Sequence, residues 1–131
     1  MDILDEYKKE IIEDTKIDQF NILDKQLMLP TIKHKWVSRL IDCKKNLNRL
    51  FKKKKDIKKI VVEQIQDSIP KSLPKAALDI KIEGSEKVKE INDDIEKYEL
   101  LVEYLEKVEK IFSSMSFDIK NATDLIKMET T

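Results

Sequence analysis

The residues best suited to binding chemistry are closely spaced lysines in the middle of the sequence. The segment "RLFKKKKDIKKIVVEQ", residues 49–64, contains six lysines and one arginine. Ammonium groups at this density attract nucleic-acid phosphates, acidic protein surfaces or anionic membranes, although a lysine run on a helix is often only a solvated face. The candidate nucleic-acid-binding residues are Lys45, Arg49, Lys52, Lys53, Lys55, Lys58 and Lys59.

Residue patterns for other kinds of chemistry are absent from the sequence. His34 and Cys43 are the only residues of their types, so neither a zinc site of usual composition nor an intramolecular disulfide can form. The chain has one glycine and no glycine-rich phosphate loop. We therefore expect a protein that is not an enzyme and that needs no metal or cofactor.

The net charge of zero hides a strong segregation of charge along the chain. Residues 1–30 carry four basic and eight acidic groups (net −4), residues 31–62 carry twelve and two (net +10), and residues 83–109 carry four and ten (net −6). Charge of one sign confined to a short segment creates a local field that attracts the opposite charge. The middle segment is therefore predicted to bind a polyanion or an acidic surface.

The composition indicates the fold class. In 131 residues, 40% are apolar, 40% are charged and few are aromatic, which is typical of long amphipathic helices in one domain or in a short domain with an arm. We predict an all-α fold. Because the sequence has no secretory apolar region and no apolar run near the length of a membrane span, we expect a cytosolic protein that crosses no membrane.

Two helices are predicted in the first thirty residues. In "MDILDEYKKEIIED", Leu4, Tyr7 and Ile11 form one helical stripe, with acidic residues near its start, where the helix dipole favours them. A short second helix is expected to begin after Asp18, a suitable N-cap, and to end before Pro30. The boundary at the proline could be a kink instead of a break.

One long basic helix is predicted from residue 31 to residue 66. Its apolar stripe lies within about 60° of one direction on a helical wheel, at Trp36, Leu40, Cys43, Leu47, Leu50, Ile57 and Val61. Most candidate binding residues lie opposite this stripe or on its flanks, and only Lys54 falls inside it. We expect Trp36 to pack in the core and not to stack on bases, and Cys43 to be an inert buried thiol.

Residues 70–85 are predicted to form a linker. Pro70 and Pro74 interrupt the helical pattern, and the alternating "ALDIKIE" is typical of a short extended segment near residues 76–83. Ser85 can cap the next helix, and a further amphipathic helix is expected after "SSMS". The helix that begins after Ser85 carries two adjacent apolar seams, which predict assembly of several copies. The predicted oligomerisation residues are Val88, Ile91, Ile95, Tyr98, Leu101, Val102, Leu105, Val108 and Phe112.

These patterns divide the chain into three regions. Residues 1–69 form an N-terminal helical region that contains the basic helix and is predicted to bind nucleic acid, residues 70–85 form the linker, and residues 86–131 form the oligomerisation region. Binding to nucleic acid is expected to be tolerant of sequence and strongly dependent on salt, because lysines contact phosphates and cannot distinguish bases.

The order of these features also matches a known family. An acidic N-terminal helix leads to "IDQF", then "KHKW" precedes the basic "CKKNLNRLFKKKKDIKK", and the chain closes with "LLVEYLEKVEKIFSSMSFDIKNATDLIKME". Over nearly its whole length the chain resembles the UvsY-type recombination mediator proteins of T4-like bacteriophages. The resemblance implies an accessory protein of homologous recombination, without catalysis, in the cytoplasm of the infected bacterial host.

The resemblance also implies partners and an assembly state. It implies binding to single-stranded DNA, loosening of the phage single-strand-binding protein, and help for the phage recombinase in forming a filament. It implies a ring of six or seven copies joined through the C-terminal helices. A hexamer or heptamer would place several weak basic sites along one strand, and linked weak sites bind far more tightly than one site alone.

The family's contact pair for single-stranded DNA is incomplete in this sequence. The family uses a lysine and an arginine separated by one residue in the central basic stretch. Here Lys58 or Lys59 can occupy the lysine position, but the arginine position holds Ile60 or Val61. The dense lysine run at residues 52–55 could supply the missing charge.

Two other hypotheses fit the same residues. A coiled-coil adaptor without catalytic activity could use the basic helix to bind an acidic protein or a membrane surface. A packaging protein could use it to bind duplex DNA regardless of sequence. Competition between single-stranded and duplex DNA distinguishes the last hypothesis from a single-strand binder, and binding to neither form would favour the adaptor.

Overall fold

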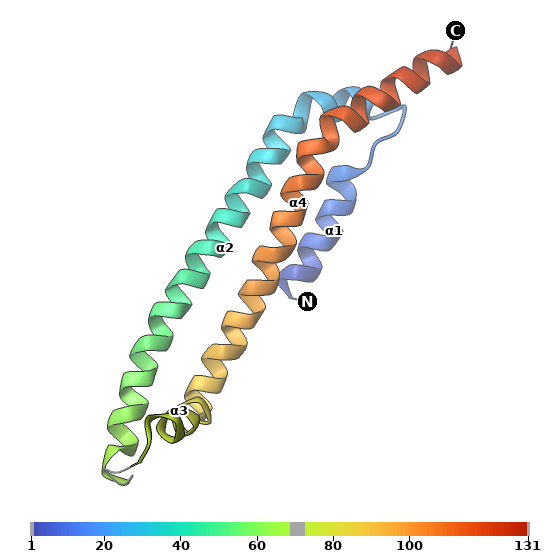
Figure 1. The fold of residues 1–131 in the computed structure, drawn as a ribbon. Coiled ribbons are helices and arrows are strands. Elements are labelled where there is room, and N and C mark those ends of the chain that lie inside the picture. Colours follow the sequence, from blue (N-terminus) through green and yellow to red (C-terminus); the bar gives the residue numbers. More distant parts are fainter. Residues whose placement is uncertain (1, 69–72, 131) are drawn as a thin grey trace. The chain divides into compact units, whose positions relative to one another are not determined.

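The fold is entirely helical in the part of the chain that the structure describes. The computed structural model describes residues 2–68 and 73–130. These residues form the helices shown in Figure 1, which are α1 (Ile3–Thr15), α2 (Ile22–Ile65), a 3-10 turn (Gln66–Ser68), α3 (Lys75–Glu83) and α4 (Glu86–Thr130). The all-α prediction is confirmed. No described helix combines the length and the hydropathy that a membrane span requires.

Helix α2 runs without a break through Pro30. The predicted short helix before the proline and the basic helix after it are one element, so of the two alternatives left open at Pro30 the structure excludes a break and agrees with a kink. Figure 1 shows that α2 bends in its N-terminal part, as expected where a proline lacks the N–H group that would bond to Gln26. Asp18 does not cap this helix directly, because the helix begins at Ile22. Its side chain instead accepts hydrogen bonds from the backbone N–H groups of Phe20 and Asn21, at 2.8 and 2.9 Å.

Helix α4 likewise continues through "SSMS", where the sequence predicted an interruption. The hydroxyl groups of Ser113 and Ser114 donate to the carbonyl oxygens of Glu109 and Ile111, at 2.9 and 3.0 Å, and so bond within the helix. Burial of Met115, whose side chain is 2% exposed, keeps this turn packed against the core. The predicted cap at the start of the helix is confirmed, because the Ser85 hydroxyl accepts a hydrogen bond from the Val88 N–H.

A short helix replaces the predicted extended segment. Residues Lys75–Glu83 form α3, which ends at Gly84. Leu78 and Ile82 are one helical turn apart and both pack against the same apolar cluster, whereas Ile80, between them, is 73% exposed. A lone strand would leave its backbone groups without partners, and a helix satisfies them internally. Pro70, predicted to interrupt the chain, lies outside the described residues.

The chain forms two compact units, and the division into three functional regions stays a prediction. The first unit comprises Met1–Ile41 with Leu101–Thr131, and the second comprises Asp42–Leu100. Each unit therefore combines part of α2 with part of α4. The N-terminal part of α2 belongs to the first unit, and the lysine-rich part belongs to the second.

Trp36 lies at the centre of the first unit. Its side chain is 2% exposed and its ring stacks on Phe112, with the ring centroids 6.3 Å apart. Tyr7 of α1 meets the same ring edge-on at 5.4 Å, and the indole N–H donates to Asp14 at 2.8 Å. Aromatic contacts of this kind join α1, α2 and α4, and the prediction that Trp36 is a core residue is confirmed.

A partly buried network of charges fastens α1 to α2 beside this core. The Glu10 carboxylate accepts hydrogen bonds from Arg39 and Lys35, and the Lys35 ammonium also donates to Asp14 at 2.6 Å. The Arg39 guanidinium lies 4.7 Å from the centre of the Trp36 ring. Hydrogen bonding from Arg39, together with the positive charges of Arg39 and Lys35, lowers the pKa of Glu10. These cations of α2 are therefore committed to holding α1.

The second unit has a smaller core. Val61, Ile82 and Val88 are buried together, one each from α2, α3 and α4, and residues packed around them include Ile57 and Leu78. Val88 is fully buried. This cluster fixes α3 against the lysine-rich part of α2.

Most of the predicted oligomerisation residues belong to these cores. Tyr98 and Val102 are half-buried. The other seven are at most 7% exposed within a single chain: Val88, Ile91, Ile95, Leu101, Leu105, Val108 and Phe112. The premise that both seams are bare on a monomer is therefore wrong, because other residues of the same chain, such as Trp36 on Phe112, cover them. Assembly through these residues stays untested.

Candidate nucleic-acid interface

All seven candidate binding residues lie on α2 within the second unit. Lys58 is half-buried, and the other six are exposed. A regular helix carries the side chains around its axis in steps of about 100°. The candidates therefore point in different directions around α2, and one of them, Lys58, approaches α3.

Three lysines form a row on the side of α2 that faces away from buried Val61. Lys45, Lys52 and Lys59 are spaced by seven residues, which corresponds to about 10.5 Å along the helix axis for each step. We call these three residues the outer row. The described residues show no ion pair for any of them, so their ammonium groups face solvent without a carboxylate partner. The outer row can bind phosphates spaced along an extended polyanion.

Other cations flank the outer row. Arg49 donates to the side chain of Asn46 at 3.4 Å, and Lys55 is exposed without an ion pair among the described residues. Lys53 lines a hollow of about 130 Å³ together with Glu90 and Asp94 of α4. Two acidic residues of α4 thus lie beside Lys53 on the inner flank of the basic stretch, together with Lys87.

Lys58 and Lys54 approach a single carboxylate on α3. The Lys58 ammonium lies 2.9 Å from Glu83, and the Lys54 ammonium lies 3.8 Å from the same oxygen. The second oxygen of Glu83 accepts a hydrogen bond from the Asn92 amide at 3.1 Å. The hydrogen bonds from Lys58 and then Asn92 lower the pKa of Glu83. Lys54, the lysine predicted inside the apolar stripe, is therefore partly covered and paired.

The structure distinguishes the two lysines that could fill the family's lysine position. Lys59 belongs to the outer row and has no carboxylate partner among the described residues, whereas Lys58 is paired with Glu83. Ile60, one of the two candidates for the arginine position, is 46% exposed, and Val61 is buried.

Two residues near the basic stretch were missed in the sequence. Phe51 is 42% exposed and lies between basic residues on α2, so its ring could stack on one base. Its position outside the apolar stripe on a helical wheel was the signal that could have found it. Glu83 gave no such signal, because its contact with Lys58 joins residues far apart in the sequence.

Trp36 and Cys43 have no accessible surface for binding. The Trp36 ring is enclosed by Tyr7, Phe112 and the cations of the first unit, so it cannot serve as a base-stacking platform. Cys43 is a buried free cysteine, as predicted. Burial, and to a smaller extent the Asp42 carboxylate, raises the pKa of its thiol.

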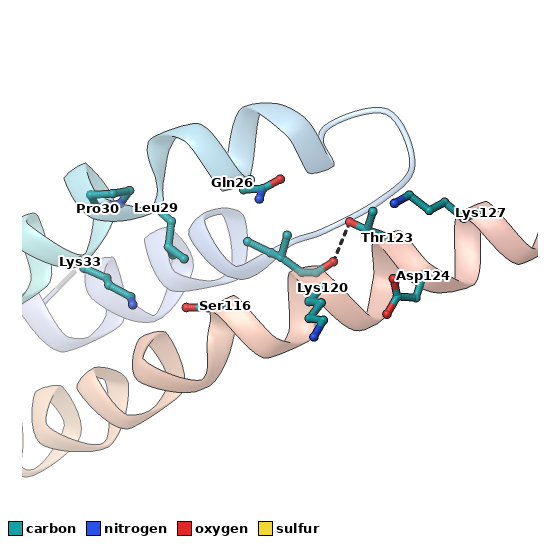
Figure 2. A pocket seen from close by; sticks show the side chains of 10 residues that line it. Gln26, Leu29, Pro30, Lys33, Ser116, Lys120, Thr123, Asp124 and Lys127 are labelled. Atoms are coloured by element: carbon teal, nitrogen blue, oxygen red, sulfur yellow. Dashed lines mark hydrogen bonds between the residues drawn. The ribbon is translucent and has the colours of Figure 1, made fainter.

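A groove of about 650 Å³ lies between α2 and α4 in the first unit (Figure 2). Its lining includes Leu29 and Pro30 of α2, and polar residues of α4 such as Lys120 and Asp124. The Thr123 hydroxyl donates to the Ile119 carbonyl oxygen at 2.8 Å, the bond drawn in Figure 2. Within the described ranges, no group of three or more histidine, cysteine or acidic side chains could hold a metal ion.

The sequence matches one family model over most of its length. Residues 10–131 match the model described as the recombination, repair and ssDNA binding protein UvsY. No curated protein sequence matches the chain significantly.

Solved structures share the fold. A crystal structure of the bacteriophage T4 recombination mediator protein UvsY, in lattice type IV, matches with a TM-score of 0.83 and 17% identity, covering 96% of this chain and 98% of that one. The same protein in lattice type II matches with a TM-score of 0.80 and 17% identity, covering 100% of this chain and 99% of that one. At this identity the likeness establishes a common fold.

Proposed function

Because the chain belongs to the UvsY family of recombination, repair and single-stranded-DNA-binding proteins, we propose that it is a recombination mediator that binds single-stranded DNA through the outer row of α2. The observation that carries this proposal is the row of three lysines, which have no carboxylate partner among the described residues, in a segment of net charge +10 (twelve basic and two acidic groups in residues 31–62). Such a surface neutralises phosphates and releases their counterions.

The mode of binding follows from the side chains available. Lysine ammonium groups contact phosphates without reading base edges, so the affinity should depend little on base sequence and strongly on salt. Flanking contacts come from Arg49, Lys53 and Lys55, and one stacking contact comes from Phe51. A single-stranded DNA has exposed bases for that stacking, which favours it over duplex DNA.

The cellular role is proposed from the family. The protein would loosen the hold of the phage single-strand-binding protein on DNA and promote loading of the phage recombinase into a filament during homologous recombination. It would do so by binding alone, without catalysis or cofactor, in the cytoplasm of the infected host. A positive row that occupies the phosphate backbone provides a direct physical means of competing with another single-strand-binding protein.

Assembly into a hexamer or heptamer is part of the proposal. Exposed apolar residues on the C-terminal part of α4, which include Phe117, Leu125 and Met128, are 71%, 60% and 74% exposed. Apolar side chains of this size gathered on one helix support contact with further copies better than the buried seams do. A ring would repeat the outer row and convert weak phosphate contacts into high avidity.

The DNA-binding proposal is tested with a fluorescently labelled oligothymidine and fluorescence anisotropy. The wild-type protein should bind it, and an unlabelled single strand should compete better than duplex DNA of equal length. Changing Lys45, Lys52 and Lys59 together to alanine should weaken binding about tenfold or more at low salt, because three phosphate contacts are lost.

A matched variant controls for net charge. Changing Lys89, Lys97 and Lys110 to alanine removes the same charge from exposed positions of α4 and should leave the affinity nearly unchanged. Equal losses of affinity in both triple variants would show that the outer row acts only through the net charge of the protein. Equal competition by duplex DNA would favour the packaging hypothesis, and binding to neither form would favour the adaptor.

The assembly proposal is tested by native mass spectrometry and sedimentation. The protein should form a closed assembly well above a dimer. Replacing Leu125 and Met128 with glutamate should disperse it, because charged groups at an apolar contact are costly to desolvate. A concentration-independent monomer would contradict the assembly and the avidity argument, while leaving single-site DNA binding intact.

A further inference from the structure

The carboxylate of Glu83, at the end of α3, lies beside the basic helix α2 at a position that a phosphate could occupy. Its carboxylate lies 2.9 Å from the Lys58 ammonium and 3.8 Å from the Lys54 ammonium. A carboxylate and a phosphate present the same kind of anionic oxygen to a lysine. Glu83 therefore gives Lys58 and Lys54 an anionic partner within the protein, which the lysines of the outer row lack among the described residues.

The position of this carboxylate is fixed by its neighbours. Ile82, the preceding residue, is buried with Val61 and Val88, which anchors the end of α3 to α2 and α4. The Asn92 amide of α4 donates to the second carboxylate oxygen at 3.1 Å. The oxygen that faces Lys58 is therefore held in place by two contacts that do not involve the lysine.

Of the two paired lysines, Lys58 lies nearer to the path proposed for DNA, whereas Lys54 lies on the side of α2 opposite the outer row. Around the axis of α2, Lys55 lies between the outer row and Lys58, about 60° from Lys58. The Lys58 and Glu83 side chains are 41% and 44% exposed, so solvent and a polyanion can reach the pair. A strand bound to the outer row can therefore reach Lys58, because Lys55 lies between the outer row and Lys58 around the helix.

We propose that Glu83 competes with a single-stranded DNA phosphate for Lys58, and that displacement of its carboxylate opens a second contact position on the α3 side of the helix. This inference rests on the proposed function. It makes Glu83 a residue that limits affinity and gives α3 a role in controlling how much of the basic helix a strand can occupy.

Ion counting gives the competition a measurable signature. While Glu83 holds Lys58, the phosphate contact with this lysine is not made and the counterion of that phosphate stays on the DNA. Without the carboxylate, the contact forms and the counterion is released. Removing Glu83 should therefore steepen the salt dependence of single-strand binding by up to about 0.7 in the log–log slope for each subunit engaged.

The deciding experiment measures oligothymidine affinity and its salt dependence for Glu83→Gln. Glutamine keeps the shape and the hydrogen bond from Asn92 but removes the charge. We expect affinity at low salt to rise about two- to fivefold, the range for loss of a partly exposed ion pair, together with the steeper slope. The control is Asp79→Asn, which removes one negative charge from an exposed position of the same helix and should change neither quantity.

A double-mutant cycle assigns the effect to the lysine. In a Lys58→Ala background, Glu83→Gln should lose most of its gain, because the main cation it releases is gone. Circular dichroism and the melting temperature verify that α3 remains folded. As a second variant, Asn92→Ala leaves Glu83 charged but frees one of its oxygens, and we expect a smaller gain in affinity.

The outcomes separate this inference from the proposed function. Wild-type binding to single-stranded DNA with equal affinity and slope in Glu83→Gln and Asp79→Asn would overturn the competition and leave the function standing. A gain that persists in the Lys58→Ala background would also overturn it. Failure of both the wild type and Glu83→Gln to bind single-stranded DNA would overturn the function and the inference together.

Discussion

Glu10 and Glu83 are each held by two cations of the same helix, α2, but in different surroundings. Glu10 bonds to Arg39 and Lys35 in the first unit, beside the stacked rings of Trp36 and Phe112. Glu83 bonds to Lys58 and approaches Lys54 in the second unit, beside three small aliphatic residues. Both contacts lower the pKa of the carboxyl group.

The difference shows how one basic helix can serve two purposes. In the first unit the guanidinium of Arg39 also lies over two aromatic rings, so its charge is committed to the fold. In the second unit the partners are lysines on flexible stems at a solvent-facing surface, where ion pairs contribute little to stability. Positive charge in the first unit holds α1, and positive charge in the second is available to a ligand.

The largest effect on stability is expected from removing Trp36, the aromatic centre of the first unit. We expect Trp36→Ala to lower the free energy of unfolding by about 3–5 kcal/mol, because a buried ring is lost and a cavity remains. Urea unfolding followed by circular dichroism measures the change.

The control is Ile60→Ala in the second unit, a half-exposed position that should change stability by about 0.5 kcal/mol or less. Similar losses in the two variants would show that the two units do not differ in how their stability depends on α2. Loss of all DNA binding in folded Trp36→Ala protein would show that the ring, although buried, is required for binding.

A smaller effect is expected from Phe51, the one aromatic ring within the basic stretch. Phe51→Ala should weaken binding to single-stranded DNA about fivefold, or about 1 kcal/mol, the low end for one stacked base because the ring is only partly exposed. The salt slope should not change, since no phosphate contact is lost. Anisotropy titrations at several salt concentrations test this, and an altered slope would mean that the substitution disturbs the lysines.

The smallest effect concerns the pH dependence of the first unit. Because the pKa of Glu10 is lowered in the folded state, its contribution to stability is complete above the usual value of 4.5 and is lost as the pH falls through the lowered value. The side chain is 38% exposed, so screening limits this contribution to about 0.5–1 kcal/mol.

Urea unfolding in steps below neutral pH, followed by Trp36 fluorescence, measures this contribution. Glu10→Gln should remove that part of the acid-induced loss, whereas Glu13→Gln, an exposed acid on the same helix, should not. Equal pH profiles for wild type and Glu10→Gln would show that the Arg39 contact does not stabilise the fold.

Helical periodicity predicted the elements of this fold better than their ends. The stripe through Trp36, Leu40 and Val61 identified the buried side of α2, because period alone determines which residues share a face. Pro30 and "SSMS" are local signals of interruption, but long helices packed along both sides of these points continue through them. Tertiary burial outweighed local preference there.

Other features could not be predicted from one sequence. An apolar seam indicates that something covers it, but not whether the cover is the same chain or another copy, and Leu105 and Phe112 proved to be covered within the chain. The pairing of Lys58 with Glu83 depends on how α3 folds back on α2, which no local pattern encodes. The basic character of α2 was visible in the sequence, while the division between paired and unpaired lysines required the structure.

The salt dependence of single-strand binding tests the central claim most directly. The claim is that Lys45, Lys52 and Lys59 contact phosphates. If so, changing all three to alanine should lower the slope of log affinity against log salt concentration by about 2.1 per subunit engaged, at about 0.7 for each contact. An unchanged slope with unchanged affinity, in a variant that remains folded and assembled, would show that the outer row is only a solvated face and would contradict the account.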